Sequence, residues 1–197
     1  MKRFLFLVFI GFIALMIFMS EYEPADQPLP KKLEQAIKQT RMMEYHDDDY
    51  DYVVRHPQFF EQTADSLMDK GACRFTFWKD SVEVVQSAFV EPNADSLTTP
   101  QAVKKYTSDL HATCQRMGDD FFILSGALHS DTGMITGRRF HAKFVKHRKF
   151  WFVQSLTYPE DCEQALQRLL QEIDTWQVWK DSVTVITDYS FIGGTLQ

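Results

Sequence analysis

The chain has 197 residues, 45% of them hydrophobic and 24% charged, and its formal net charge is −6 at pH 7. This length predicts one globular domain with tails, and the acidic balance argues against a general nucleic-acid binder, which would be basic. Three widely spaced cysteines without a C-x-x-C motif argue against a zinc-ribbon or thioredoxin-type site.

The first 20 residues predict a membrane-targeting segment. Lys2 and Arg3 precede an unbroken apolar run, Phe4–Met19, and an acidic stretch follows it. As a helix the run would span roughly 24 Å, which is short for a hydrocarbon core of about 30 Å. Because no small-residue cleavage site follows the run, we expect an uncleaved signal anchor. A cleaved signal peptide is the alternative, and a buried soluble helix is the third reading.

The positive-inside rule keeps Lys2 and Arg3 in the cytoplasm. We therefore expect a single-pass inner-membrane protein whose C-terminal domain is periplasmic, or a secreted protein if the segment is cleaved. The remaining chain holds 19 basic against 27 acidic residues, a net charge near −8.

The region after the anchor predicts a linker, a helix and an acidic turn. Residues 21–30 hold three prolines and three acids and predict an extended linker. Lys31–Met43 has the apolar spacing of a helix. His46–Asp51 follows, and we expect a solvated turn there. A divalent-cation site is the alternative, because hard cations favour carboxylates, but the run lacks the glycine and final glutamate of an EF-hand loop. No metal ligand is assigned.

Three strands are expected next. Tyr52–Arg55 predicts a strand that ends before Pro57. Cys73–Trp78 and Val82–Val90 predict a hairpin about the turn Lys79–Ser81. The stretch Trp78–Val85 recurs in similar form near the C-terminus, at residues 179–186. This predicts a turn followed by a strand at both places.

A capped helix is expected from Thr98-Thr99-Pro100 to Gly118, because a hydroxyl cap precedes proline at the first helical position. Its apolar stripe contains Val103, Leu110 and Cys114, so Cys114 is the thiol expected to be buried. With an odd number of cysteines, at most one intramolecular disulfide can form.

Strands and a closing helix complete the pattern. Phe121–His129, Met134–Val145 and Lys149–Tyr158 predict three strands. Pro159-Glu160-Asp161 opens the last helix, where acids suit the positive end of the helix dipole. The expected core comprises Val54, Phe75, Phe77, Val84, Leu110, Phe140, Phe144, Phe152, Leu166 and Leu169.

The fold class expected is α+β, with an antiparallel sheet flanked by helices in an α/β/α sandwich and preceded by an N-terminal membrane-anchor helix. The chain divides into a signal anchor or signal peptide at 1–20, a linker and short helix at 21–43, the main domain at 44–179, and a C-terminal extension at 180–197.

The main domain resembles the PsbP/Mog1-like fold family. The resemblance rests on Tyr52–Pro57 with Phe59-Phe60, on the paired segments Gly137–Phe144 and Phe150–Tyr158, and on Cys162–Trp176 as a closing helix. Domains of that fold serve as accessory subunits, partner-binding adaptors and lipoproteins, so the resemblance implies a non-catalytic binding or assembly role. The chain departs from the pattern after Trp179.

The most distinctive surface expected is a basic ribbon between Thr132 and Pro159, a stretch without one acidic residue. In period-two geometry Phe140 and Phe144 share one face of a strand, and Arg139 and Lys143 share the other. The candidate site for an anionic surface comprises Arg138, Arg139, His141, Lys143, Lys146, Arg148 and Lys149. A solvated strand face, neutralised by the protein's own acids, is the alternative.

The function predicted is therefore a membrane-anchored, extracytoplasmic binding or assembly module that contacts a protein partner, an anionic lipid or a glycan. A lipid or small-molecule carrier with an internal cavity is the alternative, and an enzyme of unknown type is the third. No phosphate loop, nucleophile elbow or H-E-x-x-H motif occurs, so no catalytic residue and no cofactor are assigned.

Overall fold

The computed structural model of the protein describes residues 27–178. The apolar run Phe4–Met19 and the C-terminal extension lie outside this range, as does the second copy of the Trp78–Val85 motif. Within the described part of the chain, no helix is long and apolar enough to cross a membrane.

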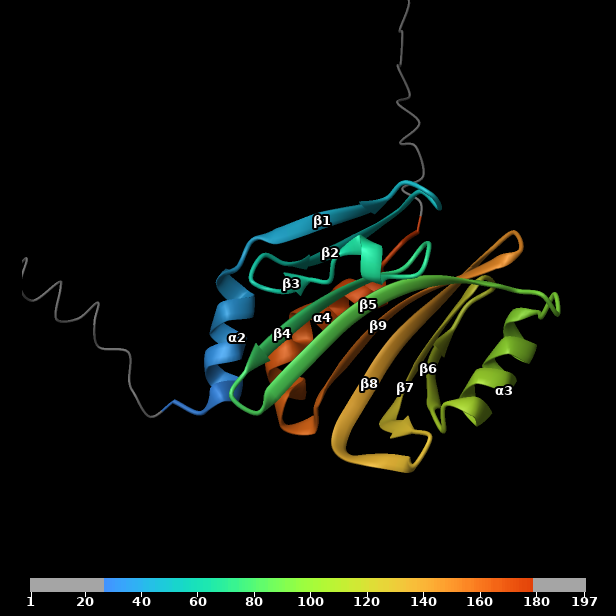
Figure 1. Cartoon of the computed structure of the whole chain (residues 1–197). Coiled ribbons are helices and arrows are strands. Elements are labelled where there is room, and N and C mark those ends of the chain that lie inside the picture. The colour runs from blue at the N-terminus through green and yellow to red at the C-terminus, as the bar shows by residue number, and fades with distance from the viewer. Residues whose placement is uncertain (1–26, 179–197) are drawn as a thin grey trace, which may run out of the picture.

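Antiparallel pairing links seven strands into one sheet (Figure 1). In spatial order the strands are β3 (Glu61–Gln62), β4 (Cys73–Lys79), β5 (Val82–Pro92), β9 (Phe150–Pro159), β8 (Gly133–His147), β7 (Phe121–Ser130) and β6 (Thr113–Met117). A separate hairpin pairs β1 (Met42–Asp47) with β2 (Tyr52–Pro57). The predicted α+β class with an antiparallel sheet is confirmed.

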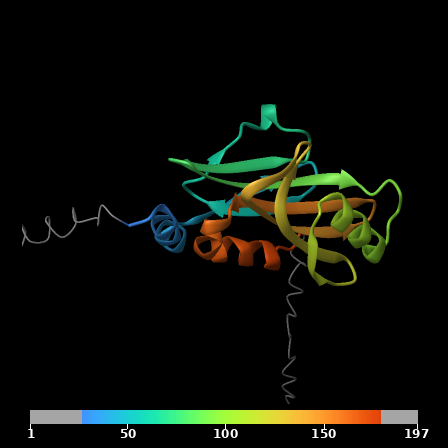
Figure 2. The ribbon, with the colours of Figure 1, turned by 90° about the horizontal axis from the view of Figure 1, so that it is seen from below.

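Three α-helices and two 3₁₀-helices accompany the described strands: α2 (Leu29–Gln39), α3 (Thr99–Asp109), α4 (Gln167–Thr175), η1 (Asp65–Leu67) and η2 (Glu160–Leu166). Both ribbon views place α2 beside η2 and α4, whereas α3 lies at the other side, next to β6 and β7 (Figure 1, Figure 2).

One face of the sheet carries the larger core, because β1, β2, α2 and α4 all pack on it. Phe75, Val84, Phe152 and Leu156 project from this face towards Leu169. The helices contribute their apolar stripes, Leu33 and Ile37 from α2 and Leu166, Leu169 and Ile173 from η2 and α4.

The other face carries a smaller core beneath α3. Ala102 is fully buried there, and Tyr106 lies with its ring centroid 4.8 Å from that of Phe144 and 5.9 Å from that of Phe122. Trp151 meets Phe122 edge to face. Because α3 covers only the part of this face next to β6 and β7, Ser155 and Thr157 on β9, which point to the same face, remain partly exposed.

The register defines two ends of the sheet. At one end lie the β4–β5 turn, closed by Lys79 and Val82, and the β7–β8 turn, closed by Ser130 and Gly133. We call this the two-hairpin end. The β8–β9 turn, between His147 and Phe150, lies at the opposite end. Figure 1 shows α2 starting at the two-hairpin end.

Two helix predictions overran into strands. The helix predicted over Lys31–Met43 ends at Gln39, and Met42 and Met43 begin β1. Thr40 is already extended, with ψ 148°, so the chain leaves the helix one residue after its last turn. Pairing with β2 then satisfies the backbone N–H and C=O groups of these residues, which would have bonded within the helix if it had continued.

The helix predicted to run to Gly118 instead ends at Asp109, and Thr113–Met117 forms the edge strand β6. The expected capping at Thr98 is present as a capping box with Gln101. His111 takes a left-handed conformation, φ 49°, which ends the helix. β6 then pairs with β7 across a short turn, so strand pairing rather than helix formation satisfies its backbone groups.

This change corrects two buried-residue predictions. Leu110 is 36% exposed rather than buried, and Cys114 is only half-buried. The fully buried thiols are Cys73 and Cys162, and all three cysteines are free. Phe77 is partly buried at the edge of the larger core, and the other predicted core residues are buried: Val54, Phe75, Val84, Phe140, Phe144, Phe152, Leu166 and Leu169.

Candidate functional site

The first two arginines of the predicted basic ribbon are paired inside the molecule. Arg138 donates to the backbone oxygen of Glu83 at 2.7 Å and to its carboxylate at 3.3 Å. Arg139 forms ion pairs with Glu160 and Glu163, both at 3.4 Å. The acids that neutralise these arginines come from β5 and from η2, which follows β9 directly.

The middle of the ribbon caps the end of α4. Lys143 is 6% exposed, and its Nζ donates to the backbone oxygens of Trp176 at 2.6 Å and Asp174 at 3.0 Å. His141 Nε2 lies 2.8 Å from the Asp174 carboxylate. Burial, followed by the nearby Arg116, lowers the pKa of Lys143. The terminal carbonyls of a helix carry partial negative charge, so a lysine there stabilises the helix end.

The last three cations of the ribbon have different environments. Lys146 projects to the opposite face, where its Nζ donates to the backbone oxygen of Leu97 at 2.7 Å and lies 5.8 Å from the Trp151 ring centroid. Arg148 and Lys149 are exposed in the β8–β9 turn. The charged strand face predicted for Arg139 and Lys143 is therefore not exposed at Lys143, which is buried. The exposed cations of the ribbon are Arg148 and Lys149 in this turn.

The acidic run His46–Asp51 is only partly the solvated turn that was predicted. Asp47 is 7% exposed at the end of β1, and its carboxylate accepts the backbone N–H of Tyr50 at 2.8 Å. Asp48, Asp49 and Asp51 are exposed. Within residues 27–178, no group of three or more His, Cys, Asp or Glu side chains is placed to hold a metal ion.

A groove of about 540 Å³ lies on the uncovered part of the sheet face that carries α3. Its floor is apolar, apart from the hydroxyls of Ser155 and Thr157. The floor residues come from neighbouring strands and share one face because alternate strand residues point the same way. They are Phe89 on β5, Phe140, Ala142 and Phe144 on β8, and Val153, Ser155 and Thr157 on β9.

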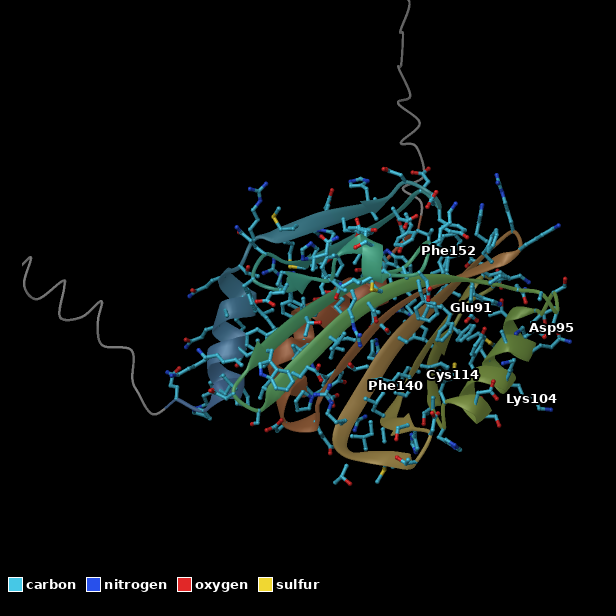
Figure 3. The ribbon with its side chains drawn as sticks, in the orientation of Figure 1. Glu91, Asp95, Lys104, Cys114, Phe140 and Phe152 are labelled. Atoms are coloured by element: carbon cyan, nitrogen blue, oxygen red, sulfur yellow. The ribbon has the colours of Figure 1, made fainter. Side chains whose placement is uncertain are left out.

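The walls of the groove come from the end of α3 and from the β7–β8 hairpin. They contribute Asp109, Leu110, His111, Leu128, His129, Ser130, Asp131 and Gly133. Figure 3 shows Phe140 on the sheet and Lys104 on the side of α3 that points away from it.

The polar rim of the groove holds two histidines and two acids and no basic side chain besides the histidines. The His111 and His129 rings lie 4.8 Å apart between centroids, and His129 Nδ1 is 3.0 Å from the backbone oxygen of Ala127. Asp109 is paired with Lys105 at 2.6 Å, whereas Asp131 is exposed in the hairpin turn. The rim therefore suits an uncharged or cationic group better than an anion.

The sequence pattern could not reveal this groove. Leu110 and His111 were placed within a helix, and His129 within a strand, so nothing brought them together. They meet because β6 returns along β7 after α3 and carries the end of the helix to the β7–β8 hairpin. The one available signal was the strand-face alternation of Phe140, Ala142 and Phe144, which predicted a shared face but not that part of it stays open.

Comparison with known proteins supports the fold. No protein-family model matches the chain, and no curated protein matches it. Among solved structures, the solution structure of cyanobacterial PsbP (CyanoP) from Synechocystis sp. PCC 6803 is similar, with a TM-score of 0.50 and 13% sequence identity. The match covers 71% of this chain and 94% of that chain. The likeness confirms the predicted architecture: the protein has a PsbP-like α+β fold.

Proposed function

We propose that the protein is a membrane-anchored, extracytoplasmic binding module that holds an apolar small molecule with an uncharged or cationic polar end. The observation that carries the proposal is the groove of about 540 Å³ on the open part of the sheet. Pockets for drug-sized ligands are typically about 300–1,000 Å³ and are mostly apolar with a few polar groups. The groove therefore favours the alternative function, a lipid or small-molecule carrier, over contact with an anionic surface through the basic ribbon.

The charge of the rim sets the expected ligand class. Of the two acids in the groove lining, Asp109 is paired with Lys105, so Asp131 is the carboxylate that faces a ligand at the rim. A carboxylate or phosphate placed there would face like charge, whereas an amine or hydroxyl would find acceptors. The rim is open to solvent, so this electrostatic preference is moderate and falls with salt.

Ligand binding can be tested on the full chain in lipid nanodiscs. The neutral fluorophore N-phenyl-1-naphthylamine should gain fluorescence on entering the groove, and dodecylamine should displace it at lower concentration than dodecanoate. Thr157→Phe fills the partly exposed floor and should abolish saturable fluorophore binding. Thr113→Phe, at an exposed position of β6 that does not line the groove, is the matched control.

The outcomes separate the readings. Saturable binding that Thr157→Phe removes and Thr113→Phe keeps supports a ligand groove, provided that both variants melt at the wild-type temperature. Binding that survives Thr157→Phe, or no saturable binding by the wild type, would contradict it. Equal displacement by the amine and the carboxylate would overturn the ligand class alone.

Anchoring by Phe4–Met19 is part of the same proposal and has its own test. The basic start, the unbroken apolar run and the lack of a small-residue cleavage site support it. Protein extracted from membranes should have the intact mass of the 197-residue chain, with or without its first methionine. A species that begins near Ser20 or Glu21 would show that the segment is a cleaved signal peptide.

A second candidate function is contact with a polyanion or an acidic partner at the β8–β9 turn, because Arg148 and Lys149 are exposed there. The full chain in detergent should then be retained on heparin, and the double variant Arg148→Glu/Lys149→Glu should elute at lower salt. Glu substitution at these exposed positions should leave the unfolding midpoint unchanged. Equal elution of the two proteins would remove this candidate.

A further inference from the structure

Three exposed apolar side chains lie at the two-hairpin end of the sheet. Trp78, the second-last residue of β4, is 67% exposed, and Met134 and Ile135, near the start of β8, are 62% and 39% exposed. These residues belong to two different hairpins that the register brings to the same end. Exposed apolar side chains at one end of a fold make that end a candidate for contact with an apolar surface.

The chain also enters the described fold at this end. Figure 1 places the start of α2, at Leu29, at the same end of the fold as the β4–β5 turn, and α2 packs on η2, which follows β9 at this end. The apolar run ends at Met19, so the eight residues that follow, up to Gln27, connect it to the fold. Eight residues reach at most about 28 Å when fully extended. Twice the radius of gyration of a fold of this size is already about 30 Å. The connection is therefore too short to let the opposite end of the fold face the membrane.

The polar residues near the two hairpins match a bilayer surface. Lys31 in the first turn of α2 and Lys79 beside Trp78 are exposed, and lysines at a membrane surface can reach lipid phosphates. Tryptophan is enriched at the headgroup level because its ring is apolar and its N–H is polar. Asp80 and Asp131 are exposed at the same end, so attraction between opposite charges is not the main source of the contact.

We propose that the two-hairpin end of the domain rests on the lipid surface, with Trp78, Met134 and Ile135 in the headgroup region. This inference rests on the membrane anchor of the proposed function. Ser130, Asp131 and Gly133 of the β7–β8 turn also line the groove. The groove then opens beside the membrane, and an apolar ligand can pass between bilayer and groove with little exposure to water.

Photo-crosslinking in the full chain tests this orientation. Benzoylphenylalanine is placed singly at position 10, 78, 117 or 134, and each protein is reconstituted at one copy per phosphatidylcholine nanodisc and irradiated. Position 10 reports on the anchor. Met117 is the matched control for Met134, because it is 52% exposed and lies at the opposite end of the sheet. Protein–phospholipid adducts are counted by intact mass.

Positions 10, 78 and 134 should form lipid adducts, with yields at 78 and 134 several-fold above that at 117. Equal yields at 78, 134 and 117, or adducts only at position 10, would overturn the orientation while leaving the anchor intact. Absence of adducts at position 10 would instead reject the anchor, and the orientation with it. The substituted positions in the fold are exposed, so folding should be retained, and the melting temperature checks this.

Discussion

Lys143 is a structural lysine of the helix end, since its Nζ donates to the backbone oxygens of Asp174, in the last turn of α4, and of Trp176, just after it. Lys143→Met keeps the apolar stem but leaves both carbonyls without this donor. We expect it to lower the free energy of unfolding by about 1–3 kcal/mol, the usual cost of buried unsatisfied groups. Urea denaturation measures this. Lys149→Met, at an exposed position, is the control and should change stability by less than about 0.5 kcal/mol.

Thiol reactivity should follow exposure in the folded chain. Cys73 and Cys162 are fully buried, and burial raises the pKa of each thiol to about 11. Both therefore stay protonated and inaccessible at neutral pH, while Cys114 on the edge strand is half-buried. Native protein should show one fast-reacting thiol with a chromogenic disulfide reagent, and Cys114→Ser should remove it. Fast labelling that survives Cys114→Ser would contradict the placement of β6.

His56 should contribute a loss of stability at mildly acidic pH. It is 9% exposed and stacks on Phe75 with ring centroids 3.9 Å apart. Burial lowers its pKa below 6.5, despite a contact with the Pro57 carbonyl that acts the other way. The unfolded chain therefore takes up this proton first, so stability falls as the pH drops below 6.5 and is retained above it.

The measurement compares wild type with His56→Phe, which keeps an aromatic ring against Phe75. Between about pH 7 and about pH 5.5 the wild type should lose more unfolding free energy than the variant, because only the wild type has this proton to bind. The same loss in both proteins would show that other groups cause it.

At the scale of the element, α4 is held by the apolar stripe of Leu166, Leu169 and Ile173 against the larger core. Leu169→Ala should lower the free energy of unfolding by about 2–5 kcal/mol, because it opens a cavity at a site that is 1% exposed. Leu110→Ala, at the 36% exposed residue after α3, is the matched control and should cost much less. Equal costs in denaturant titrations would show that one of the two leucines is misplaced.

The ends of the predicted elements agree with the structure where the sequence signal is local. The hairpin of β4 and β5 was predicted within two residues at each end, because alternation and the Lys79–Ser81 turn are local signals. The last helix was predicted at its correct place, although its first turns are the 3₁₀-helix η2. β6 was missed because Leu110, Cys114 and Met117 happen to fall at helical spacing, while the strand forms by pairing with β7.

At the scale of the whole molecule, the two ends of the sheet differ in character. The two-hairpin end carries exposed Trp78 and Met134, and the β8–β9 turn carries exposed Arg148 and Lys149. If the first end rests on lipid, an impermeant amine-reactive ester should acylate Lys149 faster than Lys79 in nanodiscs, although both are exposed in the fold. Comparable rates, read by mass spectrometry of peptides, would contradict the orientation proposed for the domain.

Local order in the sequence is enough to predict the hydrophobic run at the N-terminus, the net charge of the remainder, the alternation of Phe140, Ala142 and Phe144, and the antiparallel α+β class. The roles of the charged and apolar groups depend instead on contacts between distant elements. Lys143 became buried because α4 ends against β8, and the groove exists because α3 covers only part of a sheet face. Such contacts join residues more than thirty positions apart, and no spacing rule within one strand or helix contains them.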